Sequence, residues 1–207
     1  MLVLGIDEAG RGPTIGSMFI AGVLISEENE RKLKELGVKD SKMLSGKERE
    51  RIRKHIERLA VEIHFVEITA SEIDEKRKHM SLNELEALKI AELLEKFRKK
   101  PERLIIDAPD PDAKMFTRRI VKYTKIDSEV ISEHKADVNY PSVSAASIIA
   151  KTERDRHVKE LEKKFNIVLK TGYPHDPAAI AFLENHKGEF PEFVRKSWAT
   201  VKRIKDK

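Results

Sequence analysis

The amino-acid sequence predicts an α/β fold in which a mixed sheet is flanked by helices and followed by a C-terminal helical lobe. Strand-like apolar runs fall mainly in the first two thirds of the chain, whereas the last third carries helical patterns. The chain has 207 residues, of which 40% are hydrophobic, so a core of ordinary size can form. We expect a main domain over residues 1–165 and a helical segment with a basic tail over residues 166–207.

Five segments have the composition of strands. Residues 2–6 form a short apolar run that ends at two carboxylates and a glycine-rich turn. Residues 18–25 follow closely enough to form a hairpin with this first strand. Residues 62–69 alternate apolar and polar side chains, as in a strand with one buried face. The last two strands are expected at residues 103–107 and 128–132, which gives a sheet of five strands.

Helices are predicted where capping residues precede an apolar pattern. Ser45 and Glu48 have the spacing of a capping box and open a helix that runs to about residue 60. Ser81 and Glu84 repeat that spacing before a helix with one apolar face. Further helices are expected over residues 27–36, after Asp110-Pro111, from Pro141 to about Phe165, and after Asp176-Pro177.

Charge and composition restrict the class of protein. There are 41 basic and 36 acidic residues, a net charge of +5, which suits an anionic partner such as nucleic acid without identifying one. The absence of cysteine excludes disulfides, thiolate zinc sites and cysteine nucleophiles. The longest apolar run, residues 18–25, is far shorter than the roughly 18 residues of a membrane-spanning helix. Carboxylates at positions 7 and 8 interrupt any signal-peptide core, so we expect a cytoplasmic protein without a membrane partner.

Carboxylates at the ends of buried strands are the main chemical signal. Asp7 and Glu8 end the first predicted strand, and Asp107 ends the fourth. A buried, ionised carboxylate needs a cation or several hydrogen-bond donors, and a cluster of them attracts a hard divalent metal. Mg²⁺ and Mn²⁺ prefer oxygen ligands, and two such ions assist phosphodiester cleavage. Asp137, in a polar turn before a helix, is the fourth candidate.

Simpler interpretations of these carboxylates stay open at this stage. Asp7 or Asp107 taken singly is equally consistent with a turn cap at a strand end, and Asp137 taken singly favours a helix cap. Neighbours on a regular strand point to opposite faces, so Asp7 and Glu8 are expected to share a site only if the backbone turns or bulges there.

A glycine-rich turn and two loop side chains are candidates for substrate binding. Gly10, Arg11 and Gly12 offer backbone amides that can approach a phosphate or sugar closely, beside one guanidinium. A dinucleotide loop is disfavoured, because the glycine spacing is not that of the fingerprint and two carboxylates precede it. Tyr173 can stack on a sugar or base, and Lys42 can contact phosphate, with ordinary packing and a solvated loop as the alternatives.

Several longer motifs, taken together and in order, resemble the ribonuclease HII family, the type 2 ribonucleases H, and most of all its archaeal form. The similarity extends from residue 5 to residue 198. The matching stretches are Gly5-Ile6-Asp7-Glu8-Ala9-Gly10-Arg11-Gly12-Pro13, Val38-Lys39-Asp40-Ser41-Lys42, Ile105-Ile106-Asp107, Glu133-His134-Lys135-Ala136-Asp137, Tyr140-Pro141, Ala145-Ala146-Ser147-Ile148-Ile149-Ala150-Lys151, Gly172-Tyr173-Pro174 and Val194-Arg195-Lys196-Ser197-Trp198.

The resemblance implies a ribonuclease H-like catalytic domain and a substrate in which RNA is joined to DNA. It implies that Asp7, Glu8, Asp107 and Asp137 are catalytic carboxylates that bind Mg²⁺ or Mn²⁺. It further implies that the turn at residues 10–12 and Tyr173 recognise the ribonucleotide and its junction to DNA through the 2′-hydroxyl.

The expected activity is endonucleolytic hydrolysis of the RNA strand of RNA-DNA hybrids and cleavage on the 5′ side of single ribonucleotides in duplex DNA. We expect 5′-phosphate and 3′-hydroxyl ends, a role in DNA replication and ribonucleotide excision repair, and a monomer. No clear motif for a replication clamp occurs in the tail. A nucleic-acid binding module without catalysis and a ribonuclease H-like nuclease of the resolvase or integrase type are the alternatives.

Overall fold

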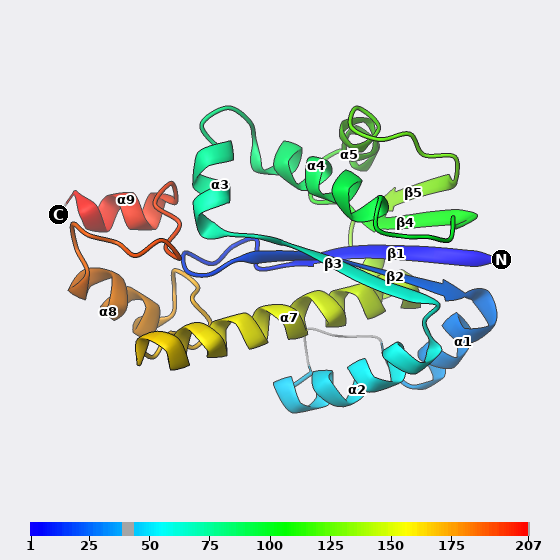
Figure 1. The fold of residues 1–207 in the computed structure, drawn as a ribbon, viewed down its shortest axis with the longest axis horizontal. Helices are drawn as coiled ribbons and strands as arrows, with labels where there is room; N and C mark the ends of the chain where they lie inside the picture. The colour runs from blue at the N-terminus through cyan, green and yellow to red at the C-terminus, as the bar shows by residue number, and fades with distance from the viewer. Residues whose placement is uncertain (39–43, 207) are drawn as a thin grey trace.

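The computed structural model describes residues 1–38 and 44–206, and a five-stranded mixed sheet forms its centre (Figure 1). The strand order is β3-β2-β1-β4-β5. β1 pairs antiparallel with β2 and parallel with β4, while β2–β3 is antiparallel and β4–β5 is parallel. The strands are β1 (Leu2–Ala9), β2 (Met18–Ser26), β3 (Glu62–Ile68), β4 (Arg103–Asp107) and β5 (Glu129–Glu133).

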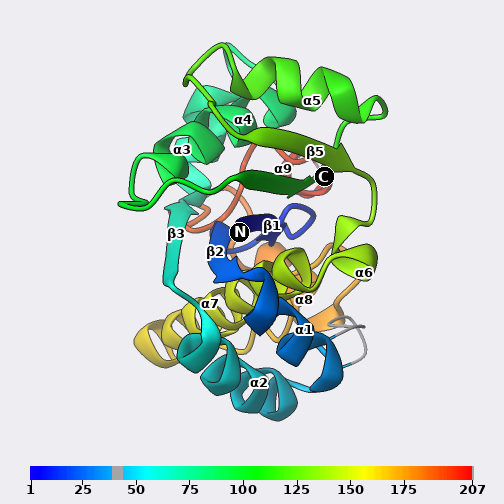
Figure 2. The same ribbon diagram turned by 90° about the vertical axis from the view of Figure 1, so that its right-hand side faces the viewer.

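Helices cover both faces of the sheet (Figure 2). One face carries the long helix α7 (Pro141–Phe165), with α1 (Glu27–Glu35) and α2 (Gly46–Leu59) outside it. The other face carries α4 (Leu82–Leu94) and α5 (Ala113–Ile120). Each face has its own core: Leu4, Ile6 and Ile106 pack toward α4 and α5, whereas Ala21 and Val23 pack toward α7.

The start of α7 lies unusually close to β1. An ideal Cβ atom placed on Gly5 would lie 2.2 Å from the backbone carbonyl carbon of Ser142, so only glycine fits at this position. The small residues 142–147 are all buried. The expectation that this stretch allows close packing is therefore confirmed, and it brings α7 against the strand that carries two of the candidate carboxylates.

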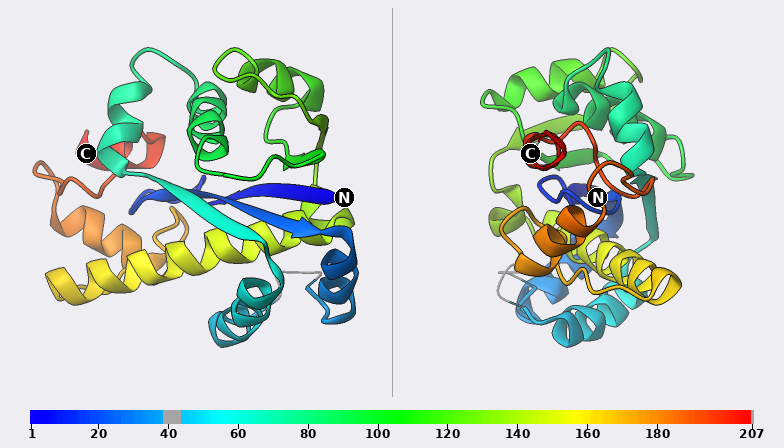
Figure 3. Two further views of the ribbon diagram at one scale, coloured as in Figure 1. Left: turned by 45° about the vertical axis from the view of Figure 1, so that its right-hand side comes forward. Right: turned by 90° about the vertical axis from the view of Figure 1, so that its left-hand side faces the viewer.

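The C-terminal helices α8 (Pro177–Asn185) and α9 (Ala199–Lys205) lie at one end of the molecule (Figure 3). They enclose a third core that includes Phe182, Phe193 and Val194 together with Ile15 from the β1–β2 loop. The predicted helical lobe is present. The division of the chain at residue 165 stays a prediction.

Most predicted elements are confirmed, and the differences have local causes. The capping box of Ser45 and Glu48 is complete. That of Ser81 is half formed, because the Glu84 carboxylate binds Arg119, Lys122 and Tyr123 instead.

The expected start of α5 at Asp110-Pro111 is wrong. Asp112 caps the helix through the backbone N–H of Lys114, and Asp110 is buried, where it accepts hydrogen bonds from Asn83 and Arg119. Two short helices, α3 (Ala70–Lys76) and α6 (Ala136–Asn139), are additional to the predicted set, and α9 was expected only as part of the C-terminal helical lobe. In the part of the chain that the structure describes, no helix is both long and apolar enough to cross a membrane.

Candidate active site

Three carboxylates converge at the carboxyl ends of the parallel strands β1 and β4. Asp7, Glu8 and Asp107 each offer an oxygen atom, and these three atoms lie within 4.8 Å of one another. They line a pocket of about 510 Å³ that is also lined by Asp137. The sequence therefore predicts the convergence correctly, since carboxyl ends of parallel strands meet at one edge of a sheet.

Asp7 and Glu8 reach this cluster from opposite faces of the sheet. β1 continues past Glu8 in one-to-one register with β2, so the two side chains alternate as in any regular strand. Asp7 makes a hydrogen bond with Ser147 on α7, whereas Glu8 lies beside Glu86 on α4. The predicted turn or bulge at the end of the first strand is wrong.

The end of β4 explains how the two carboxylates still meet. The last β1–β4 pair joins Ile6 to Ile106, and β4 ends one residue later at Asp107. Beyond that pair, Asp7 and Glu8 can approach Asp107 and each other around the end of the shorter strand. The cluster thus lies where the two cores of the protein meet.

Asp137 enters the same pocket from α6. The Asp107 carboxylate accepts a hydrogen bond from the backbone N–H of Ala136 at 2.8 Å, which ties the end of β4 to the first turn of α6. Lys135, in the left-handed conformation at φ 57°, occupies the N-cap position, so the helix-cap interpretation of Asp137 is wrong. Asp137 is 6% exposed and faces the pocket, outside the tight three-carboxylate cluster.

Burial and nearby negative charge raise the pKa values of the Asp7 and Glu8 carboxyl groups. The pKa of Glu8 rises from 4.5 to about 7, first because of burial and then because of the negative charge of Glu86. Burial raises the pKa of Asp7 well above its ordinary value, and the neighbouring Glu8 adds to the increase. A divalent cation would offset this repulsion and return the groups to their ionised form, so the buried oxygen donors fit Mg²⁺ or Mn²⁺.

Glu86 is a buried acidic residue that the sequence pattern did not reveal. It is 2% exposed and forms an ion pair with Arg11, whose guanidinium also donates to Asn83. The pKa of Glu86 rises to about 7, mainly because of burial, although Arg11 opposes the increase. The Arg11 side chain therefore binds α4 in this structure, and its expected phosphate contact stays a prediction. The available signal was an acidic residue between apolar neighbours on the inner face of α4.

The turn at residues 10–12 lies against Tyr173. Gly10 has φ +90°, a conformation that favours glycine. An ideal Cβ atom on Gly12 would lie 3.0 Å from Cε1 of Tyr173, so a larger residue would displace the ring. Tyr173 is half-buried rather than exposed, and the guanidinium carbon of Arg154 lies 5.5 Å from the centre of its ring. Lys42, the remaining predicted contact, lies outside the described residues.

A polar stripe on α7 completes the pocket. It consists of Ser147, Lys151 and Arg154, whose spacing of four and three residues places them on one face of a helix. Lys151 donates to the Ser147 hydroxyl at 2.8 Å, and Arg154 donates to the carbonyl oxygen of Thr171. The sequence contained this spacing, but small residues beside it suggested packing alone.

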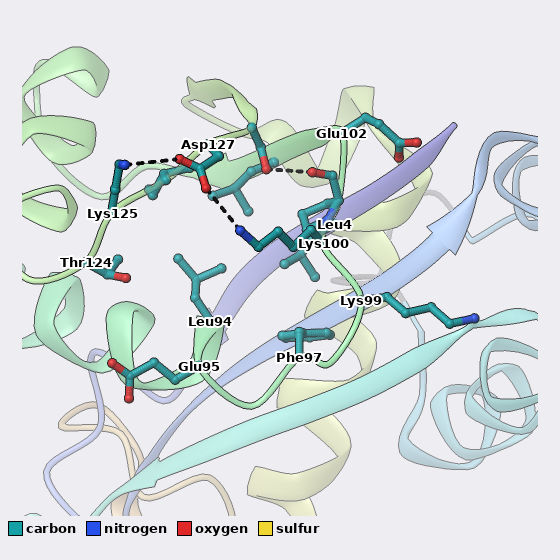
Figure 4. A pocket seen from close by; sticks show the side chains of 14 residues that line it. Leu4, Leu94, Glu95, Phe97, Lys99, Lys100, Glu102, Thr124, Lys125 and Asp127 are labelled. Atoms are coloured by element: carbon teal, nitrogen blue, oxygen red, sulfur yellow. Dashed lines mark hydrogen bonds and ion pairs between the residues drawn. The ribbon is translucent and has the colours of Figure 1, made fainter.

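A second pocket, of about 460 Å³, lies near the amino ends of β1 and β4 (Figure 4). Leu4, Leu94 and Phe97 line its apolar part. At its edge, Lys100 and Lys125 pair with Asp127 at 3.1 and 4.0 Å. It lacks a convergent carboxylate cluster among the described residues, so the pocket at the carboxyl ends of the strands is the candidate active site.

Comparison with known proteins agrees with this fold. A family model described as Ribonuclease HII matches residues 4–201. The ribonuclease HII of Methanothrix thermoacetophila is 44% identical over 208 residues, covering 99% of this chain and 98% of that protein. The crystal structure of the ribonuclease H2 from Pyrococcus horikoshii OT3 has a TM-score of 0.92 and 42% identity, covering 100% of this chain and 98% of that one.

A second solved structure, described as the PCNA:RNase HII complex from Archaeoglobus fulgidus, has a TM-score of 0.86 and 37% identity, covering 96% of this chain and 95% of that one. The near-complete coverage in both directions shows that the shared fold spans the C-terminal helices as well as the sheet. The chain therefore belongs to the ribonuclease HII family, hydrolytic nucleases that cleave RNA in RNA-DNA hybrids with divalent metal ions.

Proposed function

We propose that this chain cleaves the RNA strand of hybrids and also cuts on the 5′ side of single ribonucleotides embedded in duplex DNA. The observation that carries the proposal is the convergence of Asp7, Glu8 and Asp107 within 4.8 Å, in a pocket shared with Asp137 and the turn at residues 10–12. The carboxylates would bind the metal ions needed for hydrolysis, and the turn at residues 10–12 would contact the sugar of the ribonucleotide.

The four carboxylates are the proposed ligands of two divalent cations. Asp7, Glu8 and Asp107 are close enough to share one cation, while Asp137, on α6, extends the set toward a second. When bound, such cations activate water for attack on phosphorus and stabilise the leaving 3′-oxygen, which yields 5′-phosphate and 3′-hydroxyl ends. Asp7 is held by a hydrogen bond with Ser147, and Asp107 accepts one from the Ala136 N–H, so these two ligands are positioned before substrate arrives.

Recognition of the ribonucleotide is assigned to the turn at residues 10–12 and to Tyr173. The glycines let substrate approach the backbone amides, and the tyrosine ring lies against Gly12 where a sugar would bind. Lys151 and Arg154 line the same pocket and add positive charge for the phosphates.

The first experiment compares the wild-type protein with Asp107→Asn on a DNA duplex that contains one ribonucleotide. Loss of one carboxylate ligand is expected to lower kcat at saturating Mg²⁺ by at least about a thousandfold, because the metal supplies several kcal/mol of transition-state stabilisation. Asp127→Asn, an exposed position in the second pocket, is the matched control and should retain activity. Undiminished cleavage by Asp107→Asn would exclude the proposed metal site.

The substrate panel separates this proposal from the alternatives. We expect cleavage of the hybrid and of the single-ribonucleotide duplex, and none of the all-DNA duplex. Binding of all three duplexes without cleavage would favour a nucleic-acid binding module. Cleavage of the all-DNA duplex would favour a nuclease of the resolvase or integrase type.

A replication clamp is a partner to test in the same work. The Archaeoglobus fulgidus relative was solved as a complex with PCNA, and we propose that this chain also binds such a clamp through a surface away from the carboxylate pocket. Gel filtration with a purified archaeal clamp should show a joint peak, whereas separate elution at micromolar concentrations would argue against it.

A further inference from the structure

Arg195 is the largest fully buried side chain of the described residues, at 0% exposure. It lies in the loop before α9, and no carboxylate of the described residues lies within ion-pair distance of its guanidinium. Burial, together with the smaller effect of the positive charge of Arg154, lowers the pKa of Arg195 to about 9. Burying a charged guanidinium is unfavourable, and an apolar side chain would fill the same space without that cost. The contribution of Arg195 therefore lies in the hydrogen bonds that its guanidinium makes.

Those hydrogen bonds all go to the loop between β1 and β2. The guanidinium donates to the backbone carbonyl oxygens of Gly10 at 2.6 Å, of Arg11 at 3.0 Å and of Gly16 at 2.9 Å. One planar group therefore joins the two ends of the loop. Lysine cannot replace this arrangement, because a single ammonium cannot present donors along three separate directions in one plane.

The direction of these carbonyl groups fixes the direction of two amides. No described peptide bond is cis, and in a trans peptide the C=O of one residue and the N–H of the next point in opposite directions. Because the carbonyls of Gly10 and Arg11 point to Arg195, the N–H groups of Arg11 and Gly12 point away from it. Residues 10–12 and Tyr173 line the candidate active-site pocket, whereas Arg195 is not among its lining residues, so the guanidinium and the pocket lie on different sides of the turn.

The third carbonyl of the turn provides an internal contrast. The carbonyl of Gly12 accepts a hydrogen bond from the indole N–H of Trp198 at 3.3 Å. The following residue is Pro13, which has no N–H group, so this contact orients no amide. Arg195 thus acts on the amides of Arg11 and Gly12, and Trp198 on neither.

Backbone pairing holds Arg195 in place beneath the loop. Ile15 and Val194 form an isolated β-bridge, and the Arg195 N–H donates to the carbonyl of Thr14 at 2.9 Å. Thr14 in turn donates its N–H to the carbonyl of Gly172 at 2.9 Å, directly before Tyr173. The C-terminal segment, the glycine turn and the tyrosine therefore form one connected unit.

We propose that Arg195 is a positioning residue for ribonucleotide recognition, whose guanidinium directs the N–H groups of Arg11 and Gly12 toward the 2′-hydroxyl side of the pocket. The proposal rests on the proposed function and deepens it, since it names the side chain that sets the geometry of the recognition turn. Arg195 acts from beneath the loop and touches neither substrate nor metal.

The test measures preference and not activity alone. Two duplexes of one sequence, with and without a single ribonucleotide, are bound in Ca²⁺ to obtain a Kd ratio, and the first is then cleaved in Mg²⁺ to obtain kcat and KM. Arg195→Lys is expected to reduce the preference for the ribonucleotide duplex about tenfold, as for the loss of one or two well-directed hydrogen bonds. Binding of the all-DNA duplex should stay within about twofold of wild type.

Two control variants make the result specific. Arg53→Lys removes another buried guanidinium, which joins α2 to α7 and makes no hydrogen bond to the loop, and should leave the preference intact. Trp198→Phe removes the donor to Gly12 and should reduce the preference less than Arg195→Lys does. All assays are run well below the lowest Tm of the set.

A measurement on wild-type protein covers the case in which Arg195→Lys does not fold. The amide signals of Arg11 and Gly12 in ¹⁵N-labelled protein should shift more with the ribonucleotide duplex than with the all-DNA duplex. Equal shifts would overturn the proposal, as would full preference in Arg195→Lys or an equal loss in Arg53→Lys. Absence of any ribonucleotide preference in wild-type protein would instead overturn the proposed function, and the inference with it.

Discussion

Replacement of Glu8 by glutamine should stabilise the metal-free protein while it removes a proposed metal ligand. The pKa of Glu8 is raised from 4.5 to about 7 in the folded protein, so the folded state binds the proton more tightly than the unfolded state. The stability that the folded protein gains from protonation of Glu8 is fully present below pH 4.5 and is lost as the pH rises through about 7. The difference between 4.5 and about 7, at ~1.4 kcal/mol for each pH unit, corresponds to about 3 kcal/mol at pH 8.

Glu8→Gln keeps the shape of the side chain and removes its charge. At pH 8 in EDTA its free energy of unfolding should therefore exceed that of the wild type by this amount. For a chain of 207 residues, about 3 kcal/mol corresponds to an increase in Tm of roughly 6–12 °C. Urea denaturation at pH 5 and pH 8 gives the free energies of unfolding directly, and the two proteins should differ much less at pH 5. Glu160→Gln, at an exposed position of α7, is the matched control. Equal stability of wild type and Glu8→Gln at pH 8 would refute the reasoning.

Two further predictions concern the residues around the cluster. Glu86→Gln should lower the pKa of Glu8, because a buried negative charge beside it is removed, and the pH-dependent loss of stability should move to lower pH in the same urea series. A profile identical to wild type would show that the two groups are not coupled. Tyr173→Ala should lower the preference for an RNA-DNA junction about tenfold, and more than it lowers general duplex binding, since aromatic stacking acts on one sugar or base. Equal loss of both in a binding assay would indicate structural damage instead.

The topology of the site was predictable because it follows from strand ends. Apolar runs that stop at Asp7 and Asp107 identify two neighbouring strands, and parallel pairing brings their carboxyl ends together. The backbone detail was not predictable in the same way. Strand alternation alone predicts that Asp7 and Glu8 point apart, whereas in the structure they meet beyond the end of the β1–β4 pairing without a bulge.

The sequence did not predict which charged residues are buried. Glu86 and Arg195 look like solvent-exposed residues by type, since charged side chains are mostly exposed. Their burial depends on partners 75 and 179–185 positions away in the chain, which no local pattern records. Asp110 is not the predicted helix cap because it accepts hydrogen bonds from Arg119, on α5 itself, and from Asn83 on α4, which hold it in the interior.

The proposed role of the hydrogen bonds between Arg195 and the loop at residues 10–16 has a consequence for the order in which the protein is made. The loop is among the first segments that the ribosome makes, and Arg195, which donates to its carbonyl groups, follows 179–185 residues later. The residues of the sheet and of α7 are all synthesised by residue 165, before Arg195 is added. Contacts so distant in sequence close late in folding because of their loop-closure entropy. A nascent or truncated chain that ends before Arg195 would therefore lack the side chain that we propose orders the turn at residues 10–12.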